Sequence, residues 1–363
     1  MRSPAHLLDD PLVIDATNRG KILDSVYYLP QQLKQAWEES YETIVPTDCY
    51  LVDNIVFSGM GGSALPGRII DGLAESILKI PFEVSTGYHL PSYVNSRTLV
   101  ILNSYSGNTE ETLTALSEAR EKSAQVFCIT SGGALKQNAQ TYSLAGYFFT
   151  PQFNPSGMPR MGGGYPAMGA LGLLSKCEHV HFNTDQALSI SHYLASQAGN
   201  FNSRVPYDQN PAKLLAHSLF GKIPVIVGSS PLMGGCHVFK NMLNENSKTF
   251  ATLFDIPELN HHLLEGLLFP VTNRNNLIFL FLESQNYHPE IKKRFKITKD
   301  VVRQNGIEVL TYHTRSGKPY IEVFEIFQLA GFVSFYLAAL NLVDPTPIPW
   351  VDYFKQQMAK ATI

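Results

Sequence analysis

The chain has 363 residues, of which 44% are hydrophobic, so it can bury one large core or two ordinary ones and is not expected to be disordered. Its 28 basic and 31 acidic residues give a formal net charge of −3, which argues against nucleic acid or an anionic membrane as a partner. Small anionic ligands remain compatible with this charge, because helix ends and a few Lys or Arg side chains can bind them.

The first 50 residues are predicted to be helical, because "KILDSVYYLPQQLKQAWEESYE" has apolar positions at helical spacing. Charged residues interrupt the apolar run that a signal peptide would need, so none is predicted. The four cysteines, Cys49, Cys128, Cys177 and Cys236, are far apart and include no C-x-x-C pair. This spacing favours free thiols in a reducing cytoplasm over a zinc site or a disulfide framework, and we expect a cytoplasmic protein.

Four short apolar runs in the first half of the chain predict buried strands at residues 54–59, 82–86, 98–103 and 125–130. A helix is predicted after the first run, through "PGRIIDGLAESI", and another after the third run, ending near Lys122. Strands that alternate with helices are typical of βαβ units and a parallel sheet.

The middle of the chain predicts a connection followed by a second α/β unit. Residues 151–176 are rich in Gly, Pro and Met and predict a linker that runs into a helix, and residues 185–220 predict further helix. Strands are then predicted at 222–230, 276–284 and 307–312, with a helix through "HVFKNMLNENSK" after the first of them.

The segment 323–343 is apolar enough to imitate a membrane span, but it stands alone and contains polar residues such as Glu325 and Gln328. A helix that is apolar all round also suits the centre of a domain, so we predict a buried core helix and no membrane partner. A last helix is predicted in "IPWVDYFKQQMAK". The chain is therefore divided into an N-terminal helical segment and two similar α/β subdomains, covering residues 1–50, 51–176 and 177–363.

A glycine-rich loop, "GMGGSALPG", follows the first predicted strand. Its glycines let the backbone turn tightly and let a ligand approach the N–H groups, and Ser63 can cap the next helix or donate to a ligand. A nicotinamide site is disfavoured, because the glycine spacing is imperfect and "FEVSTG" ends the second strand without a ribose-binding acid. An ordinary strand-to-helix turn is the alternative.

The stretch "NSYSGNTEE" follows the third predicted strand. Asn108 and Glu111 have the spacing of a capping box, so Asn108 is expected to cap the next helix. The hydroxyls of Ser104, Ser106 and Thr109, together with the N–H groups of that helix end, can bind a phosphate without any lysine. The alternative is that these hydroxyls bind the turn's own backbone, but their number favours phosphate.

Five motifs occur in order along the chain, namely "GMGGS", "SYSGNTEETL", "NENSK", "PELNHH" and "DPTPIPWVDYFK". Together they resemble the bifunctional phosphoglucose/phosphomannose isomerase family, which is built from sugar isomerase (SIS) domains. The serine-rich motif alone would indicate only an SIS domain, whereas "NEN" followed by "ELNH" is more selective. The resemblance implies an α/β fold of two SIS-type subdomains, each a parallel sheet between helices, with substrate bound by Gly61, Gly62, Ser63, Ser104, Ser106 and Thr109.

The resemblance also implies aldose–ketose isomerisation, in which a proton moves between C1 and C2 of a hexose phosphate through a cis-enediolate. A single carboxylate can remove the proton and return it to the neighbouring carbon. Glu245 matches the family's base, and Asn244 and Asn246 are placed to orient it. A solvated helix glutamate is the alternative.

Three further residues match family positions. His261 matches the histidine that opens the sugar ring, a role suited to a side chain that titrates near neutrality. In related isomerases this histidine comes from a second subunit, which implies a homodimer with composite sites. Lys355 matches a lysine that assists ring opening, and Arg160 matches an arginine that would stabilise the enediolate, with three glycines after it expected to allow close approach to a ligand. Ordinary surface roles for all three residues are the alternatives.

Two departures mark the chain as a divergent member of the family. Val238 stands where the family usually has an arginine seven residues before the base, and "LAGFVSFYLA" lacks the family's usual aspartate. The pair His261 and His262, with Glu265 nearby, is not expected to share a metal, because adjacent side chains point apart.

The sequence therefore predicts an isomerase without metal or cofactor that interconverts fructose 6-phosphate with glucose 6-phosphate and mannose 6-phosphate, as in glycolysis and gluconeogenesis. Its partners would be hexose phosphates and a second copy of the chain, with no nucleic acid. A non-catalytic SIS protein that senses sugar phosphates is the main alternative. An amidotransferase-type isomerase is a third, although the chain has no evident ammonia-supplying domain.

Overall fold

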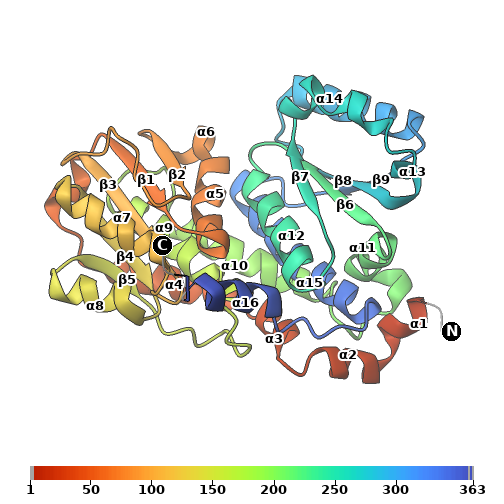
Figure 1. Ribbon diagram of the computed structural model, residues 1–363, viewed down its shortest axis with the longest axis horizontal. Helices are drawn as coiled ribbons and strands as arrows, with labels where there is room; N and C mark the ends of the chain where they lie inside the picture. Colours follow the sequence, from red (N-terminus) through yellow and green to blue (C-terminus); the bar gives the residue numbers. More distant parts are fainter. Residues whose placement is uncertain (1–3, 359, 362–363) are drawn as a thin grey trace.

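The computed structural model describes residues 4–358 and 360–361 and has two lobes, each built around a parallel sheet (Figure 1). The strands of the first lobe are β1 (Asn54–Ser58), β2 (Phe82–Ser85), β3 (Thr98–Asn103), β4 (Gln125–Thr130) and β5 (Ala145–Phe148). Those of the second lobe are β6 (Ile223–Gly228), β7 (Thr252–Asp255), β8 (Leu277–Glu283) and β9 (Glu308–His313). The predicted α/β class with two parallel sheets is confirmed.

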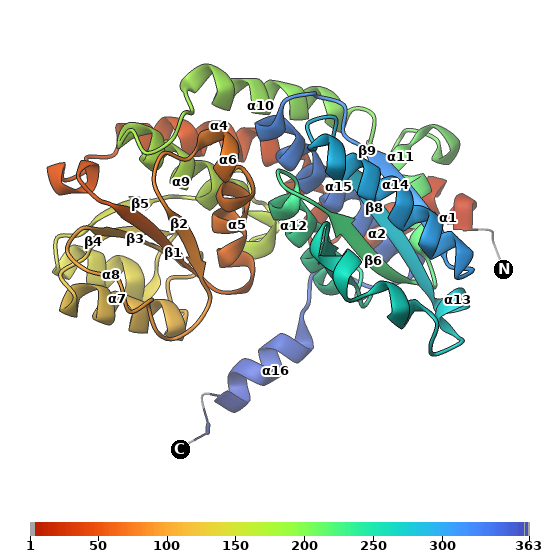
Figure 2. The same ribbon diagram turned by 90° about the horizontal axis from the view of Figure 1, so that it is seen from above.

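Helices cover both faces of each sheet and fill the space between the lobes (Figures 1 and 2). The α-helices are α1 (Pro4–Asp9), α2 (Pro11–Thr17), α3 (Ile22–Tyr27), α4 (Leu29–Glu42), α5 (Leu65–Gly72), α6 (Ala74–Ile77), α7 (Glu110–Glu121), α8 (Gly133–Thr141), α9 (Gly164–Lys176), α10 (Thr184–Ala198), α11 (Pro211–Leu219), α12 (Met233–Glu245), α13 (Asn273–Asn276), α14 (Pro289–Gln304), α15 (Pro319–Leu340) and α16 (Pro349–Met358). Short 3-10 helices are η1 (Thr47–Tyr50), η2 (Gly61–Ala64), η3 (Pro159–Met161), η4 (Tyr207–Gln209), η5 (Glu258–His261) and η6 (Leu264–Leu267).

The two sheets repeat one strand order. The first runs β2-β1-β3-β4-β5 and the second β7-β6-β8-β9, and every pairing is parallel. In the first lobe the chain continues from β1 toward one edge of the sheet and from its neighbour β3 toward the other edge. In the second lobe it continues from β6 and β8 in the same two opposite directions. Crevices that bind ligands in open α/β sheets lie outside the carboxyl ends of the strands at such points.

The apolar helix α15 is the centre of the molecule. It is long and apolar enough to cross a membrane, but the 18-residue window that passes this test is fully buried inside the protein. Helices α10, α11 and α12 pack against it. The prediction of a buried core helix in this part of the chain is confirmed.

The N-terminal helices join both lobes. Helix α4 packs against α9 of the first lobe, while α1 and α2 pack against α15. Lys213 of α11 is completely buried, and its Nζ donates to Asp9 Oδ1 and to the carbonyls of Ser203 and Val205, each at 2.8 Å. The N-terminal segment is therefore fixed to the second lobe by a buried, fully paired ammonium group.

Five of the α-helices and strands had no sequence prediction, namely α8, β5, β7, α13 and α14. The predicted helix over 185–220 is two helices, α10 and α11, separated by an irregular segment that contains η4. The predicted helix through "NENSK" ends at Glu245, and Lys248 has a φ of +56° that no α-helix continues.

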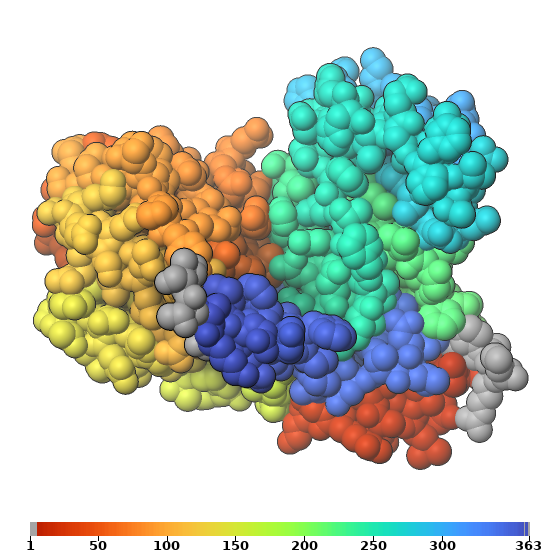
Figure 3. Space-filling view, viewed as in Figure 1, coloured from red at the N-terminus to blue at the C-terminus, as the bar shows by residue number. Residues whose placement is uncertain are grey.

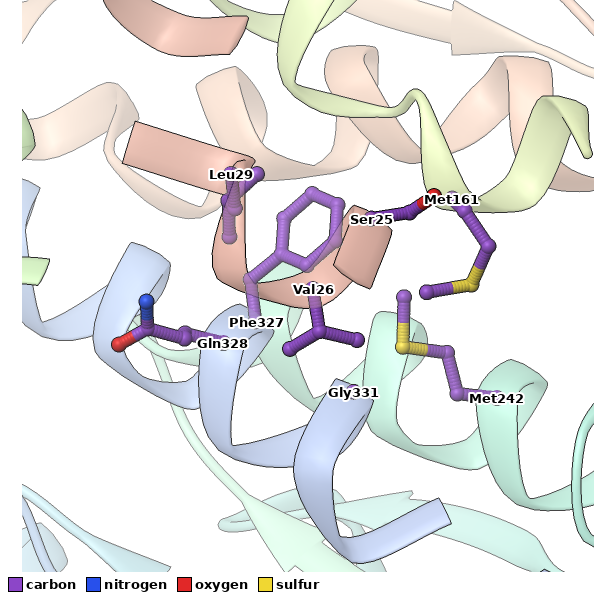
Figure 4. Close-up of a pocket in the computed structure, with 8 residues that line it drawn as sticks. All are labelled: Ser25, Val26, Leu29, Met161, Met242, Phe327, Gln328 and Gly331. Atoms are coloured by element: carbon purple, nitrogen blue, oxygen red, sulfur yellow. The ribbon is translucent and has the colours of Figure 1, made fainter. Parts of the chain in front are cut away.

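A cavity of about 10 Å³, room for one water molecule at most, lies where α3, α12 and α15 meet η3 (Figure 4). Met161 of η3 and Met242 of α12 lie side by side at its edge, and Val26 and Gly331 also line it (Figure 4). This nearly complete packing fixes α12 against the segment that carries Arg160.

Candidate active site

The loops after β1 and β3 meet at the carboxyl edge of the first sheet. Asn103 Nδ2 donates to the carbonyl of Ser63 at 2.7 Å, and the N–H of Tyr105 donates to Ser63 Oγ at 3.3 Å. Ser63 therefore joins the two loops, while neither η2 nor α5 has a side-chain cap. Gly61 has a φ of +52°, and the space beside it and beside Gly62 is open, so a ligand can approach this backbone.

The hydroxyls after β3 serve the turn and retain donor capacity. Ser104 Oγ accepts from the N–H of Gly107 at 3.1 Å and lies 2.8 Å from Thr109 Oγ1, and Ser106 Oγ accepts from the N–H of Asn108 at 3.3 Å. Since these bonds use mostly the oxygen lone pairs, the proton of Ser106 and one proton of the Ser104–Thr109 pair remain for a ligand.

The expected cap of α7 is wrong. Thr109 holds the N-cap position without a side-chain bond to the helix, and Asn108 Oδ1 instead accepts from the N–H of Ala134 at 3.0 Å. Two buried atoms next to this helix start, Thr112 Oγ1 and Asn103 Oδ1, have no hydrogen-bond partner among the described residues. The N–H groups of the uncapped helix start and the Thr112 hydroxyl can donate to a bound anion or water, whereas Asn103 Oδ1 is an acceptor and suits water.

Close packing of two helices directs Glu245 toward these loops. A Cβ on Gly234 of α12 would lie 2.4 Å from Ile69 Cα, and one on Gly72 of α5 would lie 3.1 Å from the carbonyl of Pro231. The two helices therefore run antiparallel and side by side (Figure 1). Glu245, at the carboxyl end of α12, consequently lies toward the loop that precedes α5.

Glu245 is a half-buried carboxylate surrounded by cations. Burial raises its pKa, while the charges of Arg160, Lys248, Lys355 and Lys240, in that order, oppose the increase. The net effect is a pKa above that of a free glutamate. A pKa closer to neutrality suits a group that must accept a proton as a base and then return it as the conjugate acid. The surplus of positive charge favours an anionic ligand beside it.

Arg160 is buried and held from three sides. Its Nε donates to Asn246 Oδ1 and its Nη2 donates to the carbonyls of Pro345 and Thr346, each at 2.7 Å. Burial lowers the pKa of the guanidinium, and the nearby charge of Glu245 opposes this. The guanidinium is thus a preorganised positive charge, in contrast to the mobile surface arginine that was the alternative.

The asparagines beside Glu245 do not orient its carboxylate as expected. Asn246 is buried and positions Arg160, while its Nδ2 donates to Ser334 Oγ at 3.1 Å. Asn244 ties the end of α12 to Ala251 through two hydrogen bonds. Both residues fix the frame around Glu245, and neither contacts its side chain through a hydrogen bond.

The glycines after Arg160 serve internal packing, in contrast to the expectation that they face a ligand. A Cβ on Gly162 would lie 2.6 Å from the ring of Tyr105, and one on Gly163 would lie 2.8 Å from the ring of Phe327. Since Tyr105 belongs to the loop after β3, the contact with Gly162 sets Arg160 at a fixed place relative to the predicted phosphate loop.

Lys248 is a site residue to which the sequence prediction gave no role. Its Nζ donates to the carbonyls of Glu245, Pro345 and Pro347, and burial lowers its pKa to about 8. Lys248 and Arg160 together hold the segment 345–347, which leads into α16. The "NENSK" motif contains this lysine, but nothing in the sequence pairs it with a segment almost one hundred residues away.

The remaining predicted residues lie at the margin of this site. Lys355 is exposed on α16, and its charge reaches Glu245. His261 is exposed at the end of η5 in the second lobe, and it is not among the groups whose charges influence Glu245. Within one chain, the structure thus brings Arg160 and Lys355 within electrostatic reach of Glu245, and His261 has no hydrogen bond or ion pair with any of these three residues.

A separate crevice of about 370 Å³ lies between the lobes, outside the carboxyl ends of β6, β7 and β8, in the groove that Figure 3 shows between the lobes. Its lining includes Glu75, Asp255 and Asn286 but, among the described residues, neither a lysine or arginine nor any predicted site residue. The crevice is therefore less suited to a dianion than the surroundings of Glu245. Among the described residues no three His, Cys, Asp or Glu side chains group closely enough to hold a metal ion.

Comparisons with known proteins match the chain along most of its length. Residues 50–144 match the SIS domain family, and residues 208–358 match the family described as bacterial phospho-glucose isomerase C-terminal SIS domain. The bifunctional phosphoglucose/phosphomannose isomerase of Caldicellulosiruptor bescii is 33% identical over 344 residues, which cover 93% of this chain and 99% of the relative. The enzyme of the same name from Aquifex aeolicus is 29% identical, over 89% of this chain and 94% of the relative.

A solved structure gives the same fold. The crystal structure of a hypothetical protein from Thermus thermophilus superposes with a TM-score of 0.73 and covers 96% of this chain and 94% of its own. The two sequences are 16% identical, so this similarity concerns the fold alone.

Proposed function

The chain belongs to the bifunctional phosphoglucose/phosphomannose isomerase family and is a sugar-phosphate isomerase, and we propose that its substrates are fructose 6-phosphate, glucose 6-phosphate and mannose 6-phosphate. The observation that carries this proposal is the half-buried carboxylate of Glu245, which is faced by Arg160, Lys248, Lys355 and Lys240. One base in a positive surrounding fits a reaction that passes through a negative enediolate.

The phosphate end of the sugar binds at the carboxyl edge of the first sheet. The exposed backbone of Gly61 and Gly62 and the uncapped start of α7 offer N–H groups there, and Ser106 offers a hydroxyl proton. Ser63 keeps the two loops in register by accepting from the N–H of Tyr105, and Ser104 and Thr109 bind each other within the second loop. Binding the phosphate at this point leaves the reacting end of the sugar toward Glu245.

Glu245 removes the proton from C2 of the aldose and returns it to C1. The guanidinium of Arg160 stabilises the enediolate, because it is already ordered and needs no reorganisation when the negative charge develops. Rotation about the C2–C3 bond of the enediolate presents either face of C2 to the same base, which gives glucose or mannose 6-phosphate on return. The chemistry needs neither a metal ion nor a cofactor.

Ring opening precedes this step. Lys355 lies close enough to influence Glu245 electrostatically, and we assign Lys355 to the deprotonation of the hydroxyl on C1 of the sugar. His261 is assigned to protonation of the ring oxygen. His261 belongs to the second lobe, and we propose that a second copy of the chain supplies it, so that the enzyme acts in the cytoplasm as a homodimer with composite sites. The second lobe of each chain then contributes Glu245 to its own site and His261 to the site of the other copy.

The test is a coupled assay of the purified protein with glucose 6-phosphate and mannose 6-phosphate, in the wild type and in Glu245→Gln. We expect both aldoses to react in the wild type and kcat to fall at least 1,000-fold in the variant, roughly the loss expected when the group that carries the proton is removed. Glu121→Gln, at an exposed glutamate of α7, is the matched control and should retain full activity. Full activity of Glu245→Gln would reject this residue as the base.

A further inference from the structure

The crevice between the lobes occupies, in the second lobe, the position that the predicted phosphate loops occupy in the first. It lies outside the carboxyl ends of β6 and β8, the two strands from which the chain continues in opposite directions, and within the groove that Figure 3 shows. Its volume of about 370 Å³ falls in the range of pockets that hold small organic molecules. The proposed isomerisation leaves this ligand-sized space without a role.

Two carboxylates line the crevice, one from each lobe. Glu75 belongs to α6 of the first lobe, and Asp255 is the last residue of β7 in the second. Both residues are exposed, and neither side chain has a hydrogen bond or an ion pair with a described residue. No lysine or arginine of the described chain lines the crevice. The two walls therefore carry negative charge that the protein itself does not neutralise.

A third carboxylate lies behind the lining. Glu322 of α15 is completely buried, and its Oε2 accepts from Asn286 Nδ2 at 3.1 Å and from the hydroxyl of Ser284. Its Oε1 has no hydrogen-bond partner, and its carboxylate has no ion pair, among the described residues. Because Asn286 lines the crevice and uses its Nδ2 on Glu322, its Oδ1 remains free to accept from a ligand.

The hydroxyl and imidazole groups of the lining are also mostly acceptors. Ser76 Oγ donates to the carbonyl of Leu73 at 2.8 Å, and Ser229 Oγ donates to that of Ile256 at 2.7 Å. Both hydroxyls thus spend their proton on the protein and offer lone pairs only. His288 Nδ1 accepts a backbone N–H at 3.2 Å, which leaves the Nε2–H of the neutral ring as one of the few donors. Such a lining fits a ligand rich in N–H groups.

The charge of the crevice favours a cation over an anion. The starts of α12, α14 and α15 lie at its edge, and each contributes roughly half a positive charge. In sum these helix ends carry less charge than the three carboxylates. The rest of the lining is largely apolar and includes Met233, Ile256, Ile291 and Pro319, which suits the aliphatic body of an organic ligand.

A single metal ion does not fit this arrangement. Among the described residues no three His, Cys, Asp or Glu side chains come close enough to share one ion, so Glu75, Asp255 and His288 do not converge. A ligand that meets both carboxylates must be extended. We propose that the crevice binds a linear aliphatic polyamine, whose ammonium groups pair with Glu75 and Asp255 and whose methylene chain covers the apolar lining.

The polyamine site is separate from the proposed active site. Met233 and Glu245 are the first and last residues of α12, so the crevice lies roughly 18 Å from the proposed base along the helix. The inference concerns binding alone and does not depend on which reaction the protein catalyses.

The test is isothermal titration of the full chain with spermidine, a linear triamine. We expect saturable binding with a Kd of about 1 mM or below, weakened at least about fivefold in Glu75→Gln and in Asp255→Asn, because each loses one charge-assisted contact. The matched control is Glu258→Gln, an exposed glutamate outside the crevice, which should bind as the wild type does. Absence of saturable binding by the wild type, or equal affinity in all four proteins, would overturn the proposal.

Two further titrations fix the ligand class and the place of binding. The uncharged chain 1,8-octanediol should bind at least about tenfold more weakly than spermidine, and equal affinity would overturn the assignment of a cation. Glu245→Gln should bind spermidine with the affinity of the wild type, and a loss in this variant would show that spermidine occupies the site of the proposed base instead. Because Glu75 and Asp255 are exposed, their amide variants should keep the circular dichroism and thermal unfolding of the wild type.

Discussion

Replacement of Arg160 by alanine tests the frame of the site, and the structure allows its effect to be estimated. The guanidinium makes three hydrogen bonds of 2.7 Å to Asn246, Pro345 and Thr346 and is buried. A hydrogen bond from a charged donor contributes about 1.5–3 kcal/mol. Because water can enter the space and satisfy part of the acceptors, we take the lower end for each of the three bonds and expect Arg160→Ala to lower the free energy of unfolding by about 4–5 kcal/mol.

Arg160→Lys separates the charge from the geometry. An ammonium group cannot reproduce the planar fork that reaches Asn246 and two carbonyls at once, so we expect a loss of about 1–2 kcal/mol. Because a lysine charge would not be held where the enediolate forms, we also expect kcat to fall about 100-fold, as when one preorganised oxyanion donor is removed.

The assay for both variants is urea unfolding followed by circular dichroism, together with hydrogen exchange of residues 345–358. Arg204→Ala, at an exposed arginine, is the control and should change stability by less than about 0.5 kcal/mol. If Arg160→Ala unfolds like the wild type and leaves exchange in this segment unchanged, Arg160 does not hold the segment that leads to α16.

Three further predictions concern Gly234, Glu245 and Ser106. Gly234→Ala should lower the free energy of unfolding by about 2 kcal/mol or more in a urea titration and should reduce kcat, because its Cβ would lie 2.4 Å from Ile69 Cα. The control is Gly266→Ala, whose Cβ would meet nothing within 4 Å, so it should change neither stability nor kcat. Glu245→Gln should stabilise the protein at neutral pH, because burial raises the pKa of this carboxyl and ionising it costs stability. The gain in stability of the variant over the wild type should shrink to zero as the pH falls below about 4, where the wild-type carboxyl is protonated in both the folded and the unfolded state. Thermal unfolding of both proteins as a function of pH tests this, and a stability difference that does not change with pH would contradict the reasoning. For the same reason, activity of the wild type should be lost on the acid side at a higher pH than a free glutamate would give. Ser106→Ala should raise the KM for glucose 6-phosphate about tenfold with little change in kcat, and an equal fall of kcat instead would place Ser106 at the reacting carbons.

The strands of both sheets could be predicted to the extent that they are continuous apolar runs. β3 and β4 have the predicted bounds, because a strand buried on both faces has a nearly continuous apolar run, here with polar residues such as Thr98 and Asn103 at its ends. β7 has four residues, none of them buried, so its sequence lacks that signal. The face of α14 shows helical spacing through buried Phe295, Thr298 and Val302, but its high content of charged residues conceals the pattern.

The site could be predicted as a set of residue types, and its contacts could not. Glu245 and Arg160 were chosen from motifs, yet the partners of Arg160 include Pro345, 185 residues away in sequence. The capping role expected of Asn108 failed because its side chain finds the N–H of Ala134, in a helix that follows the next strand. Local patterns carry the chemistry of single residues, whereas long-range packing decides which groups those residues actually bind.

The role of His261 was predicted by motif alone, and in the structure this residue is exposed at the end of η5 in the second lobe. This arrangement makes the composite site a prediction that depends on the second copy. A measurement of the oligomeric state therefore tests whether that copy is present.

The measurement that most directly tests the proton transfer by Glu245 is isomerisation of glucose 6-phosphate in D₂O, followed by NMR of the product. A single carboxylate that passes through an enediolate exchanges part of its proton with solvent before returning it. We therefore expect substantial but incomplete deuterium at C1 of fructose 6-phosphate from the wild type, and neither product nor label from Glu245→Gln. Product formed by the wild type without any deuterium, or labelled product from Glu245→Gln at the wild-type rate, would contradict this account.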